Sequence, residues 1–205
     1  MERIDCRLMV FAKAPIPGRV KTRLIPLLGE EAASALYERL ALYCLNEAIE
    51  ADVGPVDVWC TPTTDHPFFV DCARQFDITL RHQVGGDLGQ RMAHAFSETL
   101  KITPYALLMG ADCPSLKRED IRATKTVLEK GHDAVLIPAE DGGYVLLGLR
   151  RYAKALFSGI SWGTASVLEQ TRMRLRGLGW QWQELPERWD VDRPEDLRRM
   201  MSIPI

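Results

Sequence analysis

The chain has 205 residues, of which 46% are hydrophobic and 26% are charged, and its formal net charge is −2. That length suits one α/β domain over residues 1–205, and the near-neutral charge gives no basic field of the kind that binds nucleic acid. No uncharged apolar stretch approaches about 18 residues, and residues 1–5 lack the features of a secretory signal. The five cysteines show no CxxC pair and no metal-ligand spacing, so we expect reduced thiols in a cytoplasmic protein without a membrane span.

The apolar pattern predicts strands and helices that alternate along the chain. Strands are expected at residues 7–11, 56–60, 78–82, 105–109, 134–138 and 145–149, with an edge strand at 180–185. Helices are expected at residues 30–51, 66–76, 88–101, 118–130 and 165–176, with a short helix at 152–157 and a last helix near Pro194. Between two of the apolar runs, residues 141–143 read Asp-Gly-Gly, which predicts a hairpin.

A cationic loop follows the first predicted strand. Residues 11–24 contain two prolines and a glycine, which disfavour regular structure, and four cations lie in or beside them: Lys13, Arg19, Lys21 and Arg23. Open α/β sheets bind ligands beyond the carboxyl ends of their strands. We therefore predict that this loop binds the phosphates of a nucleotide or nucleotide sugar. The alternative is a basic surface loop that only connects a strand to a helix.

A second candidate segment is rich in glycine. Gly85, Gly86 and Gly89 surround the start of the helix predicted from residue 88, and glycine allows the backbone to approach a ligand closely. The alternative is a turn in which Asp87 caps that helix, since aspartate is a favoured cap.

Asp112 comes just after residues 105–109, the most continuous apolar run in the middle of the chain. A carboxylate at this place suits Mg²⁺, which takes oxygen ligands from one or two carboxylates and from substrate phosphates. Asp192 is a candidate second carboxylate, distant in sequence but able to meet Asp112 in space. The alternatives are a turn opened by Asp112 and a helix cap formed by Asp192. Cys113 is expected to be a small buried thiol, because no histidine is near it in sequence.

Two further segments carry candidate substrate contacts. In the predicted hairpin, Asp141 and the backbone of Gly143 are expected to contact a sugar or acceptor hydroxyl while also forming the turn. Trp162 lies between small residues, and its ring either packs in the core or stacks on the ring of a ligand. We favour packing, because a buried tryptophan more often contributes to a core.

These segments together resemble a known family. Residues 11–15, 18–24, 85–92, 110–114, 140–144, 162–164 and 190–197 resemble, in this order, the sequence blocks of bacterial GT-A-type nucleotide-diphospho-sugar transferase-like proteins of the DUF2064 type. That family is similar to phospholactate guanylyltransferases and molybdenum-cofactor nucleotidyltransferases. Ala12 stands where the family usually has Thr or Ser. The Asp-x-Asp of many glycosyltransferases with this fold is absent here, because Cys113 and Pro114 follow Asp112, and this favours a nucleotidyltransferase-like site.

The resemblance implies a single three-layer α/β/α domain, Rossmann-like and of the GT-A type, with a mixed and mostly parallel sheet. It also implies a nucleotide-dependent transfer assisted by Mg²⁺ or Mn²⁺. The implied phosphate-binding residues are Lys13, Gly18, Arg19, Lys21 and Arg23, of which Lys21 and Arg23 act in catalysis together with Asp112. The implied neighbours of the base or ribose are Gly85, Gly86 and Asp87, and those of the acceptor or sugar are Asp141, Gly143 and Tyr144. The implied metal ligands are Asp112 and Asp192, with Asp190 a weaker candidate.

Three functions are compatible with these residues. We favour transfer of a sugar from a nucleotide sugar to a small-molecule acceptor. The alternative enzyme joins an NTP to a small phosphorylated acceptor and releases pyrophosphate, which suits the strongly cationic loop. A non-catalytic nucleotide-binding module is the third, and the retention of Asp112, Asp192 and the loop cations argues against it. The sequence does not identify the base, the sugar, the acceptor or the oligomeric state.

Overall fold

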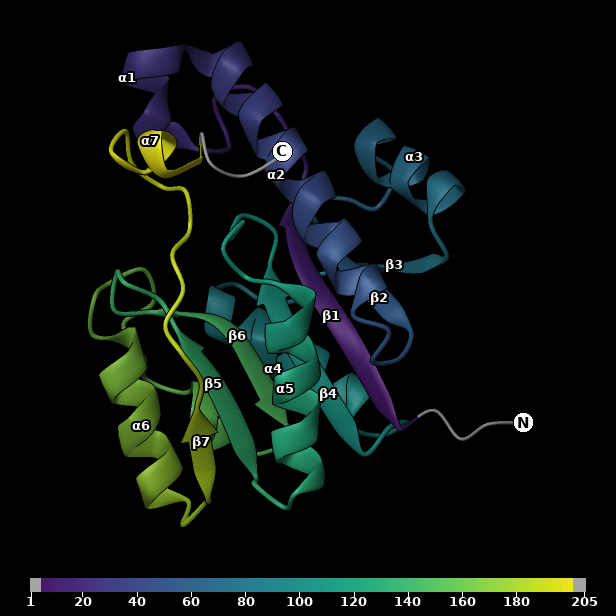
Figure 1. The fold of residues 1–205 in the computed structure, drawn as a ribbon, viewed down its shortest axis with the longest axis vertical. Coiled ribbons are helices and arrows are strands. Elements are labelled where there is room, and N and C mark those ends of the chain that lie inside the picture. The colour runs from purple at the N-terminus through teal and green to yellow at the C-terminus, as the bar shows by residue number, and fades with distance from the viewer. Residues whose placement is uncertain (1–4, 201–205) are drawn as a thin grey trace.

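A seven-stranded mixed sheet forms the centre of the structure, a computed structural model that describes residues 5–200 (Figure 1). The strands are β1 (Cys6–Lys13), β2 (Val56–Thr61), β3 (Ile78–His82), β4 (Tyr105–Gly110), β5 (Ala134–Pro138), β6 (Tyr144–Leu149) and β7 (Trp182–Glu184). The helices are α1 (Ile25–Leu28), α2 (Glu30–Glu50), α3 (Pro67–Gln75), α4 (Leu88–Thr99), α5 (Arg118–Glu129), α6 (Val167–Gly177) and α7 (Asp196–Met200). Two short 3₁₀ helices are η1 (Thr22–Leu24) and η2 (Lys154–Phe157).

Helices cover both faces of this sheet and give it the expected three layers. Side chains alternate between the two faces of a strand, so Leu8 and Val10 of β1 point to one face and Met9 to the other. The core on the first face includes residues of α2, α3 and α5. The core on the second face includes residues of α4, η2 and α6. Because the central strands are buried on both faces, they read as continuous apolar runs in the sequence.

The strand order β3-β2-β1-β4-β6-β5-β7 places β1 between two parallel neighbours. The order reverses beside β1, because the chain first builds outward through β2 and β3 and then returns to add β4. Ligands of open α/β sheets bind at such a reversal, beyond the carboxyl ends of the strands. Here those ends are Lys13 of β1 and Gly110 of β4. Only β6 runs antiparallel to its neighbours, which confirms the predicted hairpin and the mixed sheet.

Most of the predicted elements are present with shifted ends. The strands β3 and β5 occupy the predicted ranges, whereas β1 extends two residues further, to Lys13. The loop after β1 is not wholly irregular, because it contains η1 and α1. The short helix predicted at 152–157 is η2, and the edge strand predicted at 180–185 is the three-residue β7.

Asp192 does not cap the last helix, which was the alternative to its predicted role as a second carboxylate of the site. That helix, α7, begins at Asp196. The carboxylate of Asp196 accepts hydrogen bonds from the backbone N–H groups of Asp192, at 3.0 Å, and Arg193, at 2.7 Å. The backbone before the helix is therefore satisfied by Asp196, and the carboxylate of Asp192 makes a different contact.

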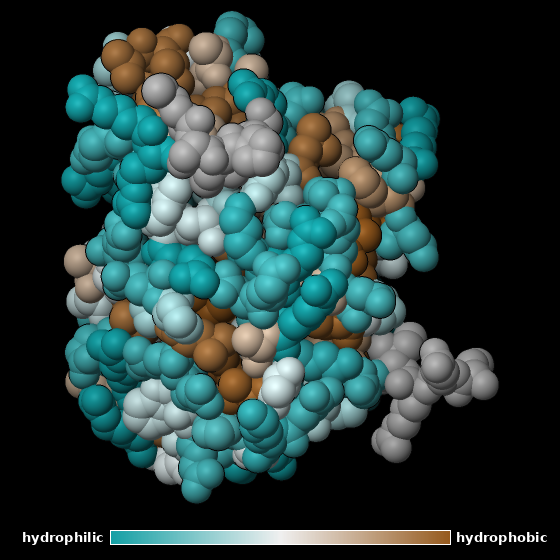
Figure 2. Space-filling model, in the orientation of Figure 1, coloured by the Kyte–Doolittle hydropathy of each residue, from teal (hydrophilic) through white to brown (hydrophobic). Residues whose placement is uncertain are grey.

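Hydrophilic residues cover most of the face in Figure 2, and the hydrophobic patches between them include one over α1, where Leu27 is 60% exposed. Within residues 5–200, no helix is long and apolar enough to cross a membrane. Residues 1–4, which carry most of the segment considered for a secretory signal, lie outside the described residues.

Candidate functional site

Two adjoining cavities lie at the reversal point of the sheet. The first, which we call the cationic cavity, has a volume of about 570 Å³, and its lining includes Lys13, Arg19, Lys21, Arg23, Arg91, Tyr37, Gln83, Asp112 and Asp192. The second, which we call the aromatic cavity, has a volume of about 240 Å³, and its lining includes Phe11, Leu88, Met92, Tyr144, Trp162, Thr164, Asp112, Asp141 and Asp190. The two cavities share Phe11, Leu88, Gly110 and Asp112. Asp112 therefore belongs to the wall between them.

Lys21 and Asp112 form the central ion pair of the site. The two residues are 91 positions apart in sequence, and Lys21 Nζ lies 2.7 Å from Asp112 Oδ2. Lys21 is only 7% exposed, and it has a left-handed backbone with φ of +46°. Such a conformation is uncommon outside glycine, and strained residues of this kind concentrate at functional sites. The sequence-predicted Lys21 is thus held rigidly at the edge of the sheet.

The ion pair fixes both groups in their charged forms. Burial by itself would lower the pKa of Lys21, but attraction to Asp112 outweighs burial and raises this pKa. Burial would likewise raise the pKa of Asp112, and the charge and hydrogen bond of Lys21 lower it instead. A buried lysine ammonium beside a carboxylate is therefore present at the cavity wall before any ligand binds.

The other cations of the loop are more open to solvent. Arg23 pairs with Asp192, 169 positions away in sequence, and both residues line the cationic cavity. Lys13 and Arg19 are exposed and line the same cavity. Gly18 gives the loop a turn with φ of +78°, a conformation that side chains rarely adopt. The structure therefore brings the four predicted loop cations to one cavity, and Gly18 shapes the loop that carries them.

Four carboxyl groups gather beside these cations. Burial raises the pKa of Asp190 to about 7, and the negative charges of Asp112, Asp141 and Asp192 add to this shift. An accumulation of carboxylates is the kind of donor set that suits a divalent cation. Among residues 5–200, however, no three acidic, histidine or cysteine side chains are arranged as a complete metal site. A metal at Asp112 and Asp192 would therefore need further oxygen ligands from a substrate.

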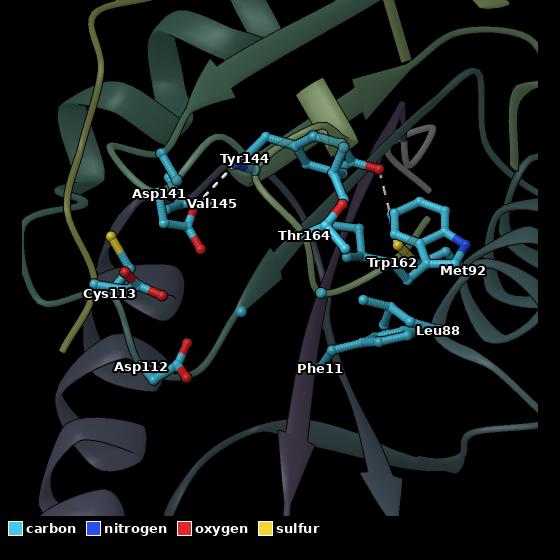
Figure 3. Close-up of a pocket in the computed structure, with 17 residues that line it drawn as sticks. Phe11, Leu88, Met92, Asp112, Cys113, Asp141, Tyr144, Val145, Trp162 and Thr164 are labelled. Carbon is cyan, nitrogen blue, oxygen red and sulfur yellow. Dashed lines mark hydrogen bonds between the residues drawn. The ribbon is translucent and has the colours of Figure 1, made fainter. Parts of the chain in front are cut away.

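The aromatic cavity has two unlike walls (Figure 3). The carboxyl groups of Asp112 and Asp141 lie on one side, and the rings of Tyr144 and Trp162 lie on the other. The two rings meet edge to face, with centroids 6.5 Å apart and an angle of 82° between their planes. Burial raises the pKa of the Tyr144 hydroxyl, so this group stays protonated. The predicted substrate residues Asp141, Gly143 and Tyr144 all line this cavity.

Trp162 combines the two roles that were considered as alternatives. It packs against the core on the second face of the sheet, and it also lines the aromatic cavity. The Trp162 ring packs directly against Gly89 of α4, because a Cβ at that position would lie only 2.3 Å from Trp162 Nε1. The expectation of a purely packing role was therefore incomplete, because burial and access to a cavity can belong to opposite faces of one ring.

The glycine-rich turn before α4 is built differently from the ligand-contacting loop that was predicted. Asp87 Oδ1 accepts a hydrogen bond from the backbone N–H of Gln90 at 2.7 Å, which confirms the helix cap. The backbone N–H of Gly86 donates to the Gln90 side chain. Gly85 and Asp87 line a separate cavity between α4 and η2. The structure therefore does not bring these residues into the cationic or the aromatic cavity.

Arg91 was missed from the sequence and belongs to the site. It lines the cationic cavity, and its Nε donates to the carbonyl of Gly85 at 3.0 Å. The glycine-rich turn thus contributes by holding a fifth cation in place. The available signal was an arginine in the first turn of a helix that begins beside the sheet edge.

Cys113 follows Asp112 but has the features of a structural thiol. Burial raises its pKa to about 12, and its Sγ donates to the carbonyl of Trp189 at 3.2 Å. A thiol in this state is a weak nucleophile, as the sequence predicted.

The mixed sheet, which reverses beside β1 with cations after β1 and the carboxylate of Asp112 after β4, has the fold of a solved candidate nucleotide-diphospho-sugar transferase. Residues 44–164 match the DUF2064 family, described as an uncharacterised protein conserved in bacteria. The chain belongs to this family, in agreement with the resemblance found in its sequence.

Named relatives indicate the class of enzyme. A 3-phospho-D-glycerate guanylyltransferase of Phenylobacterium zucineum is 28% identical over 86% of this chain and 81% of its own length. A candidate nucleotide-diphospho-sugar transferase of Desulfovibrio desulfuricans G20 superposes with a TM-score of 0.87 at 30% identity, over 96% of this chain and 87% of its own. A 4-diphosphocytidyl-2C-methyl-D-erythritol synthase of Anaerococcus prevotii shares the fold, with a TM-score of 0.60 at 11% identity over 97% of each chain. The chain is accordingly a transferase with a nucleotidyl- or nucleotide-sugar-transferase-like function.

Proposed function

We propose that the chain is a nucleotidyltransferase that joins an NTP to a small phosphorylated acceptor and releases pyrophosphate. The observation that carries this proposal is the charge of the cationic cavity, where five basic side chains gather: Lys13, Arg19, Lys21, Arg23 and Arg91. A triphosphate carries more charge than the diphosphate of a nucleotide sugar, and this cavity matches the larger charge. The guanylyltransferase relative supports the same reaction class.

In the proposed reaction, a phosphate oxygen of the acceptor attacks the α-phosphorus of the NTP. A new phosphorus–oxygen bond forms, the bond from the α-phosphorus to the bridging oxygen of the β-phosphate breaks, and pyrophosphate leaves with that electron pair. Lys21 and Arg23 stabilise the charge that develops on the leaving group, because such transfers depend on positioning and electrostatics. The ion pair with Asp112 holds Lys21 in place, so little reorganisation is needed during the reaction.

We further propose that Mg²⁺ or Mn²⁺ assists this transfer and is held by Asp112 and Asp192. The two carboxylates line the cationic cavity together, which supports a cation at this place. When bound, the metal would supply Lewis-acid stabilisation of the phosphate oxygens. The oxygen ligands that the protein does not provide would come from the substrates.

Sugar transfer from a nucleotide sugar is the second candidate. It is favoured by the Desulfovibrio protein, which is described as a candidate nucleotide-diphospho-sugar transferase. In that reaction the cationic cavity would hold the diphosphate and the aromatic cavity the sugar. A location in the cytoplasm stays a prediction under either function.

The two reactions differ in the compound that is consumed. Purified protein with Mg²⁺ or Mn²⁺ would be incubated with each of the common NTPs and a panel of phosphorylated acceptors, and pyrophosphate release would be measured. A parallel panel of nucleotide sugars would be assayed for release of nucleoside diphosphate. We expect pyrophosphate release that Lys21→Ala abolishes and that Lys101→Ala, a change on the exposed surface, leaves intact. Turnover of a nucleotide sugar without any response to an NTP would refute the proposal.

A further inference from the structure

The aromatic cavity has an unusual distribution of charge. Its lining residues in the described part of the chain include three carboxyl groups, those of Asp112, Asp141 and Asp190, and no lysine, arginine or histidine. The adjoining cationic cavity, in contrast, is lined by five lysine and arginine side chains. An anionic group is therefore favoured on one side of Asp112 and disfavoured on the other.

The remaining walls of the aromatic cavity are apolar. Phe11, Leu88 and Met92 lie below and beside the rings of Tyr144 and Trp162, facing the two carboxyl groups across the cavity (Figure 3). Aromatic faces bind flat or ring-shaped apolar surfaces, and carboxylates accept hydrogen bonds from hydroxyl groups. A volume of about 240 Å³ lies below the size of pockets for drug-sized ligands, so the occupant is small.

We propose that the aromatic cavity binds the uncharged, hydroxyl-bearing part of the acceptor, and that it rejects phosphorylated carboxylic acids such as 3-phosphoglycerate. This inference rests on the proposed nucleotidyl transfer and adds the chemical class of the acceptor. The phosphate of the acceptor lies beside Asp112 and Lys21, where the two cavities meet, and the body of the acceptor extends toward Tyr144 and Trp162. The chain thereby differs in acceptor from the guanylyltransferase relative, whose name specifies 3-phospho-D-glycerate.

Asp141 is the residue whose negative charge disfavours acceptors with a carboxylate. Lys21 compensates the charge of Asp112, and a metal at Asp112 and Asp192 would compensate it further. Asp141 stands outside that proposed metal pair, and within residues 5–200 its Oδ1 accepts the backbone N–H of Gly143, a neutral donor, at 2.9 Å. Its negative charge therefore persists in the cavity whether or not a metal is bound. A ligand carboxylate beside it meets a repulsion that an ordinary hydroxyl does not.

The test compares two acceptors that differ in one group. In sn-glycerol 1-phosphate a hydroxymethyl group replaces the carboxylate of 3-phospho-D-glycerate, and the two compounds are otherwise alike, including the configuration at C2. Their binding to the full chain would be measured by calorimetry with Mg²⁺, both with and without saturating NTP. We expect sn-glycerol 1-phosphate to bind about tenfold more tightly than 3-phosphoglycerate, and glucose 1-phosphate, whose ring can contact Trp162, to bind more tightly still. Equal or tighter binding of 3-phosphoglycerate, or binding of none of the three, overturns the proposal.

A charge-removing variant identifies the residue responsible. Asp141→Asn keeps an oxygen that can accept the N–H of Gly143, so the turn is preserved. The preference for sn-glycerol 1-phosphate over 3-phosphoglycerate should fall by about tenfold in this variant. Asp71→Asn, an exposed change on α3, should leave the preference as it is in the unmodified chain. An unchanged preference in Asp141→Asn contradicts the role of this carboxylate.

Failure of this inference and failure of the proposed function give different results. If 3-phosphoglycerate is the preferred acceptor and pyrophosphate is still released, the nucleotidyl transfer stands and the acceptor class is wrong. If the uncharged compounds bind preferentially and no acceptor supports pyrophosphate release, the cavity is correctly assigned and the reaction is wrong.

Discussion

Replacing Lys21 by alanine tests the central ion pair of the site. The change removes the ammonium that lies 2.7 Å from Asp112 Oδ2 and leaves this carboxylate without its partner. Breaking a fully buried pair in this way costs about 3–5 kcal/mol. The Asp112 side chain is 38% exposed and can be hydrated in the variant, so we expect about half of that, or about 2 kcal/mol at pH 7.

The loss of stability should depend on pH. Lys21 lowers the pKa of Asp112 in the folded protein, so the pair stabilises the fold above the ordinary aspartate pKa of about 3.9. This contribution disappears as the pH falls through the lowered pKa, because a protonated Asp112 no longer attracts Lys21. The stability difference between the unmodified chain and Lys21→Ala should therefore shrink as the pH is lowered from about 7 toward about 3.

Urea unfolding across this pH range measures the stability, and calorimetry with pyrophosphate measures the phosphate site. We expect Lys21→Ala to weaken pyrophosphate binding at least about tenfold, which is about 1.4 kcal/mol. Lys101→Ala is the matched control, because Lys101 is exposed and pairs with Glu98 one helical turn away. Equal effects of Lys21→Ala and Lys101→Ala, or a stability loss that is independent of pH, would refute the reasoning.

Three further substitutions have defined outcomes. Gly89→Ala places a Cβ 2.3 Å from Trp162 Nε1, so urea unfolding should show a loss of about 1–3 kcal/mol in the free energy of unfolding. The displaced ring should also remove the binding advantage of glucose 1-phosphate. An unchanged affinity for glucose 1-phosphate would contradict the contact between Gly89 and Trp162 as the support of this ring. Asp190 has a pKa raised to about 7, so its ionisation lowers the stability of the fold as the pH rises from about 4 to about 7. Compared with the unmodified chain, Asp190→Asn should be more stable by about 2 kcal/mol at pH 8 in EDTA and equally stable near pH 4. A stability difference that does not change with pH would contradict the raised pKa. Arg23→Ala breaks an exposed ion pair with Asp192, so thermal unfolding should show a loss of stability below about 1 kcal/mol, while the affinity for pyrophosphate falls clearly. A large loss of stability would contradict the exposed character of this pair.

Much of the fold could be predicted from local patterns. The strands β3 and β5 occupy the predicted residues: β5 is a short apolar run that is buried throughout, and β3 is an edge strand in which apolar and exposed polar residues alternate. The turn between β5 and β6 follows from Asp-Gly-Gly, whose backbone preferences are local. The cationic loop after β1 was recognised in the same way, since two prolines and a glycine exclude a long helix or strand.

The composition of the site could be predicted only in part. Lys21 and Asp112 each follow a buried strand, and the carboxyl ends of parallel strands meet at one edge, so their proximity could be expected from the sequence. The contact between Arg23 and Asp192 could not be expected from the sequence, because 169 positions separate the two residues and the contact depends on the path of the chain after β7. The turn at residues 85–87 caps α4 through Asp87, an alternative that the sequence offered, and it holds Arg91 through the carbonyl of Gly85, a contact that the sequence did not indicate.

The sequence by itself determined the order of strands and helices, the hairpin and the cationic loop. These features depend on side-chain periodicity and on the backbone preferences of glycine and proline, which act over a few neighbouring residues. The tertiary structure alone decided that Trp162 rests on Gly89 and that carboxylates and rings face each other across one cavity. Such contacts depend on how closely two distant segments approach, and packing of the whole core sets that distance.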